Sequence, residues 1–293
     1  KTVKTKNIEI AKLFIDRKYS INFFELDEII PSYDIELFLY IVNNVEEDIK
    51  ETLIDCIDNA IKFHNIQVVQ FLLTQDDVNM NKALLESVKA NDYEIFDLIL
   101  SSGKKIKNIK WQLEKSLKFI FEEHFVDTKQ INKFLTKIIN SNNVDLNYRT
   151  SSSTLLTFAC KQKLKEIVQL ILKNDKVDVN LNVSRTGNTP LIISIINKSC
   201  EISKLLIEHK NINVNQMNYI GETPLILAVR THQIFIINLI LKNKNFNPEE
   251  SKLNHSFYIS TSEISQSLLT MDSLDVNYVP TENKDFSNFW TKN

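Results

Sequence analysis

Short apolar runs alternate along the chain with polar, asparagine-rich segments. In some stretches between these runs apolar residues also lie three or four positions apart, as in Ile54, Ile57 and Ile61, which is typical of one buried face of an α-helix. Nine such runs, each followed by a polar segment, predict an all-α protein of about nine helical units, the first and last incomplete. The runs lie at residues 13–14, 38–41, 71–73, 96–100, 134–139, 168–172, 205–207, 239–241 and 268–269.

A tripeptide of a polar residue, an apolar residue and Asn follows many of these runs and sets their period. Its copies are residues 77–79, 145–147, 178–180, 213–215, 245–247 and 275–277, in steps of 68, 33, 35, 32 and 30 residues. The first step fits two units, with a degraded copy at 108–110, and earlier copies are expected at 44–46 and, shortened, at 20–22. A recurring period of this length indicates a solenoid, in which each unit packs on its neighbours.

A longer motif is repeated inside this pattern. The sequence Gly-Asn-Thr-Pro-Leu at 187–191 returns 34 residues later as Gly-Glu-Thr-Pro-Leu at 221–225, in a chain with three glycines and five prolines. Thr suits a helix N-cap and Pro suits the first helical position, where its missing N–H is not needed. With the tripeptide at 213–215 between the copies, the chain resembles the ankyrin-repeat family, whose unit is a β-turn and two antiparallel helices with a period near 33 residues. The resemblance is specific over about residues 145–250.

The resemblance implies an all-α ankyrin-repeat solenoid of stacked helix-turn-helix units with short β-hairpin or loop connections. We expect one domain over residues 1–293: a partial repeat (1–22), degenerate repeats (23–144), the clearest repeats (145–250), and a degenerate C-terminal repeat with a cap (251–293). The family's histidine in the Thr-Pro-Leu-His segment is replaced by Thr157, Ile192 and Ile226, which is expected to soften the coupling between repeats. Helix caps and hairpin glycines are expected only after residue 145.

Charge and cysteine usage limit the classes of partner. Thirty-five basic and 37 acidic residues give a formal net charge of −2, so no general attraction to nucleic acid or anionic lipid is expected. The three cysteines are odd in number and scattered, which favours a reduced, intracellular and cytoplasmic protein over a disulfide framework. No apolar run is long enough to predict a membrane-spanning helix.

No motif with catalytic spacing occurs, so the chain is not expected to be an enzyme or to hold a cofactor. It lacks a glycine-rich phosphate loop, His-Glu-x-x-His and Gly-x-Ser-x-Gly. Its five histidines are placed singly, without a second histidine at metal-ligand spacing, so no metal site is expected. The lysine-rich stretch 104–110 is interpreted as a solvated loop, with a nucleic-acid or phosphoinositide patch as the alternative.

In the ankyrin family, partners contact the hairpin around its glycine and the end of the first helix, on the concave face. Carried over by position, the resemblance implies these partner-binding residues: Arg185, Thr186, Asn188, Ile196 and Asn197 in one repeat, and Tyr219, Ile220, Glu222, Arg230 and Thr231 in the next. Tyr219 and Ile220 stand out, because aromatic anchors are typical of interface hot spots. The alternative is that both side chains fold down on the neighbouring hairpin.

The function expected from this resemblance is a noncatalytic scaffold that binds a partner protein on the concave face. One alternative is the targeting arm of a larger multidomain protein whose enzymatic domain is absent from this chain. A second is a nucleic-acid or lipid binder that uses the lysines of residues 104–110.

Overall fold

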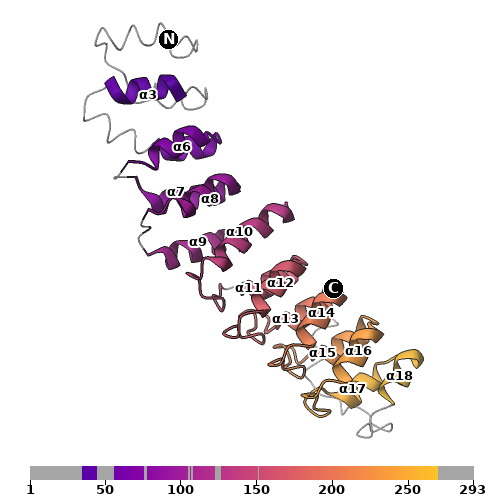
Figure 1. The fold of residues 1–293 in the computed structure, drawn as a ribbon. Coiled ribbons are helices and arrows are strands. Elements are labelled where there is room, and N and C mark those ends of the chain that lie inside the picture. Colours follow the sequence, from indigo (N-terminus) through magenta and orange to yellow (C-terminus); the bar gives the residue numbers. More distant parts are fainter. Residues whose placement is uncertain are drawn as a thin grey trace. The chain divides into compact units, whose positions relative to one another are not determined.

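The computed structural model describes residues 35–44, 56–75, 78–104, 106, 108–122, 127–150 and 152–269. They belong to two units, Lys1–Val144 and Asp145–Asn293, shown in sequence colours in Figure 1. The tripeptides expected at 20–22 and 275–277, the apolar run at 13–14 and the C-terminal cap lie outside the described residues.

All regular elements among the described residues are helices, which confirms the all-α prediction. In the first unit they are α3 (Ile35–Asn44), α5 (Ile57–Lys62), α6 (Ile66–Leu72), α7 (Met80–Lys89), α8 (Tyr93–Ser101), α9 (Ile109–Glu122) and α10 (Thr128–Asn140). In the second unit they are α11 (Leu155–Lys161), α12 (Lys165–Leu172), α13 (Pro190–Ile196), α14 (Cys200–Ile207), α15 (Pro224–Arg230), α16 (Ile234–Leu241), α17 (Leu253–Tyr258) and α18 (Ser262–Leu268). An isolated β-bridge joins Arg149 and Thr154.

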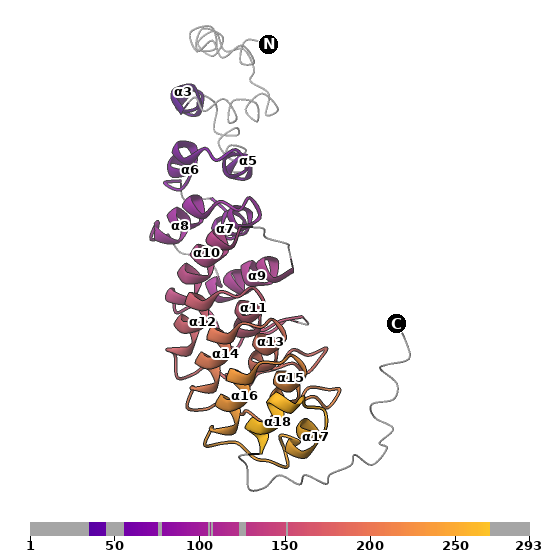
Figure 2. The same ribbon diagram turned by 90° about the vertical axis from the view of Figure 1, so that its right-hand side faces the viewer.

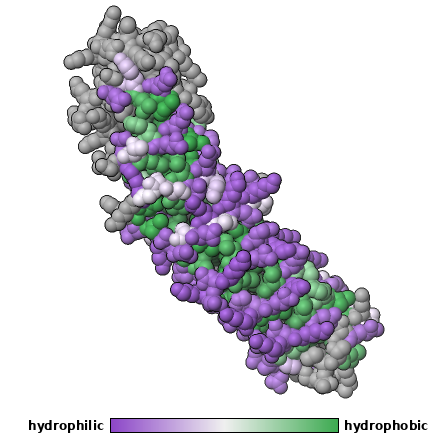
Figure 3. Space-filling model, in the orientation of Figure 1, coloured by the Kyte–Doolittle hydropathy of each residue, from purple (hydrophilic) through white to green (hydrophobic). Residues whose placement is uncertain are grey.

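The helices of each unit form two layers. First helices contact first helices in the next repeat (α5, α7 and α9; α11, α13, α15 and α17), and second helices contact second helices (α6, α8 and α10; α12, α14, α16 and α18). In the second unit the connecting loops project on the side of α13 and α15, away from α14 and α16 (Figures 1 and 2). On the face drawn in Figure 3, apolar areas are visible in the middle of each unit between hydrophilic borders.

Side-chain caps start the helices in both units, so the expectation of caps only after residue 145 is wrong. In the second unit Thr154, Thr189 and Thr223 accept a hydrogen bond from the backbone three residues on, as predicted. In the first unit Asn and Asp take this role in front of α6, α7, α8 and α10: Asn65, Asn79, Asp92 and Asp127. Their side-chain oxygens satisfy the same unpaired N–H groups, without the Thr-Pro signature that identified the later caps.

The Asn that ends each tripeptide ties its repeat to the next. In three successive repeats its side-chain amide donates to a backbone carbonyl of the following repeat and its side-chain oxygen accepts from a backbone N–H two residues further on. These pairs are Asn147 with Lys176 O (2.9 Å) and Asp178 N (2.8 Å), Asn180 with Asn211 O (2.8 Å) and Asn213 N (2.8 Å), and Asn215 with Asn245 O (2.7 Å) and Asn247 N (3.0 Å). Coupling between repeats therefore has a hydrogen-bonded component that does not depend on the histidine replaced in this chain.

In the turn between the first and second helix of a repeat, a residue other than glycine adopts the left-handed backbone conformation. This residue is Lys198 between α13 and α14, with φ 52°, and its equivalents are His64, Asn91, Lys163 and His232. Glycine adopts this conformation without the steric cost that a Cβ incurs. None of these five positions is a glycine, so these turns carry local backbone strain.

We predict that Lys198→Gly stabilises the second unit by about 0.5–1 kcal/mol. Relief of left-handed strain, worth about 1–2 kcal/mol, is partly offset by the greater freedom of glycine in the unfolded chain. The matched control is Lys204→Gly at an exposed position of α14. It should destabilise the second unit by about 1 kcal/mol. Urea unfolding followed by circular dichroism measures both, and destabilisation by Lys198→Gly would contradict the prediction.

In the first unit, His64 links two repeats through a carboxylate that also caps a helix. Its Nδ1 lies 2.5 Å from Asp92 Oδ2, while Asp92 Oδ1 accepts from Ile95 N at 3.0 Å. The hydrogen bond with Asp92 raises the pKa of His64, against a smaller opposing effect of burial and with further help from the charges of Asp92 and Glu94.

This raised pKa predicts a pH-dependent stability. A group whose pKa is higher in the folded state stabilises that state below its unfolded pKa of 6.5, and the gain is lost as the pH rises through the folded value. Because 55% of the His64 side chain is exposed, the effect should stay below about 1 kcal/mol. Hydrogen exchange of α8 amides, corrected for intrinsic rates, should show protection that falls above pH 6.5. The same profile in His64→Asn would rule out this assignment.

Candidate functional site

The candidate surface is formed by two neighbouring hairpins and the ends of the two first helices that follow them. We call it the first-helix surface and define it by residues 184–188 and 218–222, together with the C-terminal ends of α13 and α15. All of it belongs to the second unit.

Backbone hydrogen bonds close each hairpin and join the two. Val183 N donates to Asn188 O (2.9 Å), and Asn218 N donates to Glu222 O (3.0 Å). Between hairpins, Tyr219 N donates to Thr186 O at 3.0 Å. Gly187 has φ 71°, and a Cβ built on it would lie 2.5 Å from Tyr219 Cδ1, so glycine is needed there both for the turn and for the close approach of the tyrosine.

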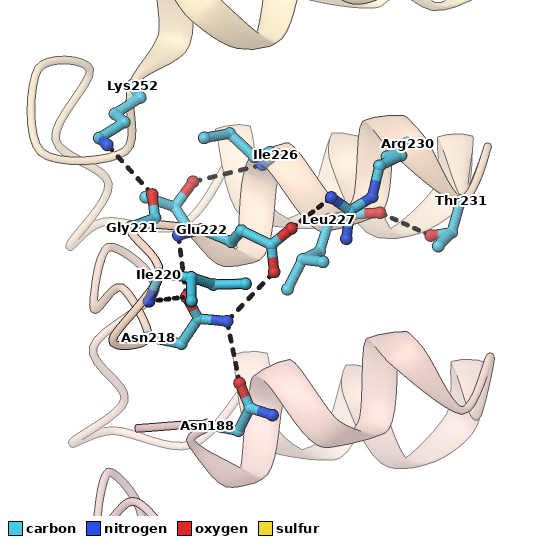
Figure 4. A network of polar contacts seen from close by, with 11 residues as sticks. Asn188, Asn218, Ile220, Gly221, Glu222, Ile226, Leu227, Arg230, Thr231 and Lys252 are labelled. Atoms are coloured by element: carbon cyan, nitrogen blue, oxygen red, sulfur yellow. Dashed lines mark hydrogen bonds and ion pairs between the residues drawn. The ribbon is translucent and has the colours of Figure 1, made fainter. Parts of the chain in front are cut away.

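A polar network fixes the second hairpin to α15 and to the preceding hairpin (Figure 4). Glu222 Oε1 accepts from Arg230 at the end of α15, and Glu222 Oε2 accepts from Asn218 Nδ2 at 3.2 Å. The same Asn218 amide donates to Asn188 Oδ1 at 3.0 Å, and Asn218 Oδ1 accepts from the backbone N–H groups of Ile220 (3.2 Å) and Glu222 (2.9 Å). A buried network whose groups are paired holds one arrangement rigidly.

The structure places the predicted contact residues in three groups. Exposed residues are Arg185, Thr186, Ile196, Tyr219, Ile220 and Arg230, half-buried ones are Asn188, Asn197 and Thr231, and Glu222 is buried. Asn197 Nδ2 donates to Lys161 O of the preceding repeat at 3.3 Å, and Thr231 Oγ1 donates to Leu227 O at 2.7 Å. Glu222, only 7% exposed, therefore positions Arg230 and the hairpin, and its side chain offers little surface to a partner.

Tyr219 and Ile220 remain accessible in this arrangement. Tyr219 packs against Gly187 of the preceding hairpin, yet 64% of the residue is exposed, and Ile220 is 46% exposed. Ile196, one repeat earlier at the end of α13, is 45% exposed. Three large apolar side chains are thus exposed on a surface whose backbone is held by hydrogen bonds.

Comparisons with known proteins agree with this architecture. The sequence model for ankyrin repeats (three copies) matches residues 126–218 and, overlapping them, 156–252. The ankyrin repeat domain of Bcl-3, described as a unique member of the IkappaB protein family, has a similar fold, with a TM-score of 0.52 and 17% sequence identity over 75% of this chain and 97% of that one. Residues 126–252 of the chain are ankyrin repeats. No curated protein matches its sequence.

Two residues that sequence reasoning missed support the surface of these ankyrin repeats. Asn218 organises the second hairpin, and Gln233, just before α16, donates through Nε2 to Ile195 O (2.8 Å) and to Thr231 Oγ1 (2.6 Å). Gln233 thereby joins α15 to the preceding ankyrin repeat. A signal for Asn218 was available, since Asn favours turns through side-chain bonds to its own backbone, whereas the bond of Gln233 across repeats has no local sequence signature.

Outside this surface, the described residues include two buried cysteines, Cys56 and Cys160, and one exposed cysteine, Cys200. Burial raises the pKa of the Cys160 thiol, which keeps it protonated and inert. No group of three or more metal-binding side chains occurs in the part of the chain that the structure describes, and no helix there is long and apolar enough to cross a membrane. In the lysine-rich stretch, Lys104 Nζ donates to Gln75 O and Lys110 Nζ lies 3.9 Å from Glu114 Oε1.

Proposed function

We propose that this ankyrin-repeat protein is a noncatalytic scaffold that binds a partner protein on the first-helix surface. Ankyrin repeats are generally protein-interaction modules, which supports this class of function. The observation that carries the proposal is the exposure of Ile196, Tyr219 and Ile220 side by side with a network that immobilises their backbone. Exposed aromatic anchors on a preformed surface are the usual source of binding energy.

Each predicted residue then has a role that follows from its position. Tyr219, Ile220 and Ile196 supply apolar contact area, while Arg185, Thr186 and Arg230 offer polar groups around it. Asn188 and Glu222 hold the second hairpin in place, and Asn197 and Thr231 bond to first helices from the turns that follow α13 and α15. Specificity would come from the hairpin tips, and the remaining repeats would keep those tips in register.

Quantitative capture from an extract of the source cell tests the proposal. The natural chain is compared with Tyr219→Ser/Ile220→Ser and with a control, Phe235→Ser/Leu269→Ser, that removes two apolar side chains of similar exposure elsewhere (51% and 54%). We expect Tyr219→Ser/Ile220→Ser to bind the partner about thirtyfold or more weakly, which corresponds to a hot spot of about 2 kcal/mol. The control variant should keep the affinity of the natural chain. Equal recovery by both variants would contradict the proposal.

A further inference from the structure

We propose that the partner segment on the first-helix surface is an acidic peptide that carries a large apolar residue. This inference rests on the proposed function and adds the chemistry of the partner. It is carried by the sign and the arrangement of the charges around the exposed apolar side chains.

The charges of this region are almost all positive. The loop segments 149–154, 183–189 and 217–223 and the first helices α11, α13 and α15 contain four basic residues and a single acidic one, Glu222. The basic residues are Arg149, Lys161, Arg185 and Arg230, all exposed. Glu222 is buried against Arg230, so this surface presents positive charge although the whole chain has a formal net charge of −2.

The second helices do not share this bias. Each of α12 and α14 contains a lysine and a glutamate, and α16 contains no charged residue. In the repeats from α11 to α16, positive charge is therefore concentrated on the first-helix side, whereas the next loop, before α17, carries the exposed acidic residues Glu249 and Glu250.

Repeat symmetry places the cations beside the apolar residues. Lys161, Ile196 and Arg230 each end a first helix, in steps of 35 and 34 residues, and these helices contact one another in sequence. At the hairpin tips, Arg185 and Tyr219 occupy equivalent positions 34 residues apart, and the bond from Tyr219 N to Thr186 O (3.0 Å) joins the two tips. Apolar side chains thus have basic neighbours along both the helix ends and the tips.

An acidic peptide with an apolar residue complements this pattern. Its carboxylates would meet Lys161, Arg185 and the exposed part of Arg230, while its apolar side chain would cover Tyr219 and Ile220. Complementary charge raises the association rate and rejects basic competitors. A nucleic-acid strand fits less well, because base stacking needs successive aromatic platforms and Tyr219 is the one aromatic residue among the large apolar side chains exposed in this region.

Selection of a random peptide library on the immobilised full chain at low ionic strength tests the inference. We expect enriched peptides to combine several Asp or Glu residues with Leu, Phe or Trp. A synthetic copy of one such peptide should bind Lys161→Glu/Arg185→Glu about tenfold more weakly. Lys173→Glu/Lys176→Glu, which reverses two exposed lysines next to α12, changes the net charge equally and should leave the affinity unchanged.

The outcomes separate this inference from the proposed function. Enrichment of neutral or basic peptides, or equal weakening by both charge variants, would overturn the acidic-peptide inference. If the binding of such peptides were still lost in Tyr219→Ser/Ile220→Ser, the proposed surface would stand, and if it were not, the surface itself would be wrong. Displacement of the acidic peptide by a dT oligonucleotide that binds more tightly would assign the cations to a phosphate polymer and also overturn the inference.

Discussion

Replacing Gly187 by alanine is expected to lower the free energy of unfolding of the second unit by about 2–5 kcal/mol. A Cβ costs about 1–2 kcal/mol in the left-handed backbone conformation of this residue, with φ 71°. It would also lie 2.7 Å from Tyr219 N and 2.5 Å from Tyr219 Cδ1, and overpacking of this kind costs a further 1–3 kcal/mol, roughly. Chemical unfolding followed by circular dichroism measures the loss.

Gly103→Ala is the matched control for this substitution. Gly103 has φ 72°, but a Cβ built there meets nothing within 4 Å. Gly103→Ala should therefore cost only the strain of a Cβ in the left-handed backbone conformation, about 1–2 kcal/mol. Equal losses for the two variants would show that the packing of Tyr219 on Gly187 contributes nothing, and would remove the basis for a fixed Tyr219.

Asn215→Ala is expected to destabilise the second unit by about 3 kcal/mol or more. The substitution deletes the bonds to Asn245 O (2.7 Å) and Asn247 N (3.0 Å) in the next repeat and the bond from Ser251. Each bond contributes about 1 kcal/mol, and buried groups left unpaired add to the loss. Hydrogen exchange should show the largest loss of protection in α17 and α18, which lie after the broken link.

The control for Asn215 is the same substitution two residues earlier. The Asn213 side chain accepts from Asn215 N (2.9 Å) within its own repeat, and its backbone N–H keeps the bond to Asn180 Oδ1 (2.8 Å). Asn213→Ala should therefore cost less than about 1 kcal/mol. If Asn213→Ala destabilised the second unit as much as Asn215→Ala, the bonds from Asn215 to the next repeat would not explain the effect of Asn215→Ala.

Periodic features of the chain could be predicted from sequence because the same pattern occurs at the same position in successive repeats. The apolar runs predicted the helices. The Thr-Pro-Leu motif predicted the caps of α13 and α15 and the hairpins before these helices. The caps of the first unit were missed because Asn65 and Asp92 have no proline after them, and Asn and Asp occur throughout this chain. A cap of that kind is visible only once the helix boundary is known.

The sequence could predict which candidate residues lie at the hairpins and helix ends, but it could not predict the bonds among them. Position in the repeat was enough to select Tyr219, Ile220 and Arg230, which are exposed. It could not separate a contact residue from a supporting one, so Glu222 was grouped with them although it is buried against Arg230. That distinction depends on a pairing between a hairpin and the far end of a helix, which only the folded geometry supplies.

Site-specific photo-crosslinking can show directly whether a partner binds on the first-helix surface. A benzophenone amino acid is introduced at Tyr219 in one chain and at Phe235, an exposed position on α16, in another, and both are irradiated in the source-cell extract. We expect a discrete adduct with one partner protein from position 219 and none from position 235. Adducts of equal yield from both positions, or an adduct from position 235 alone, would contradict it.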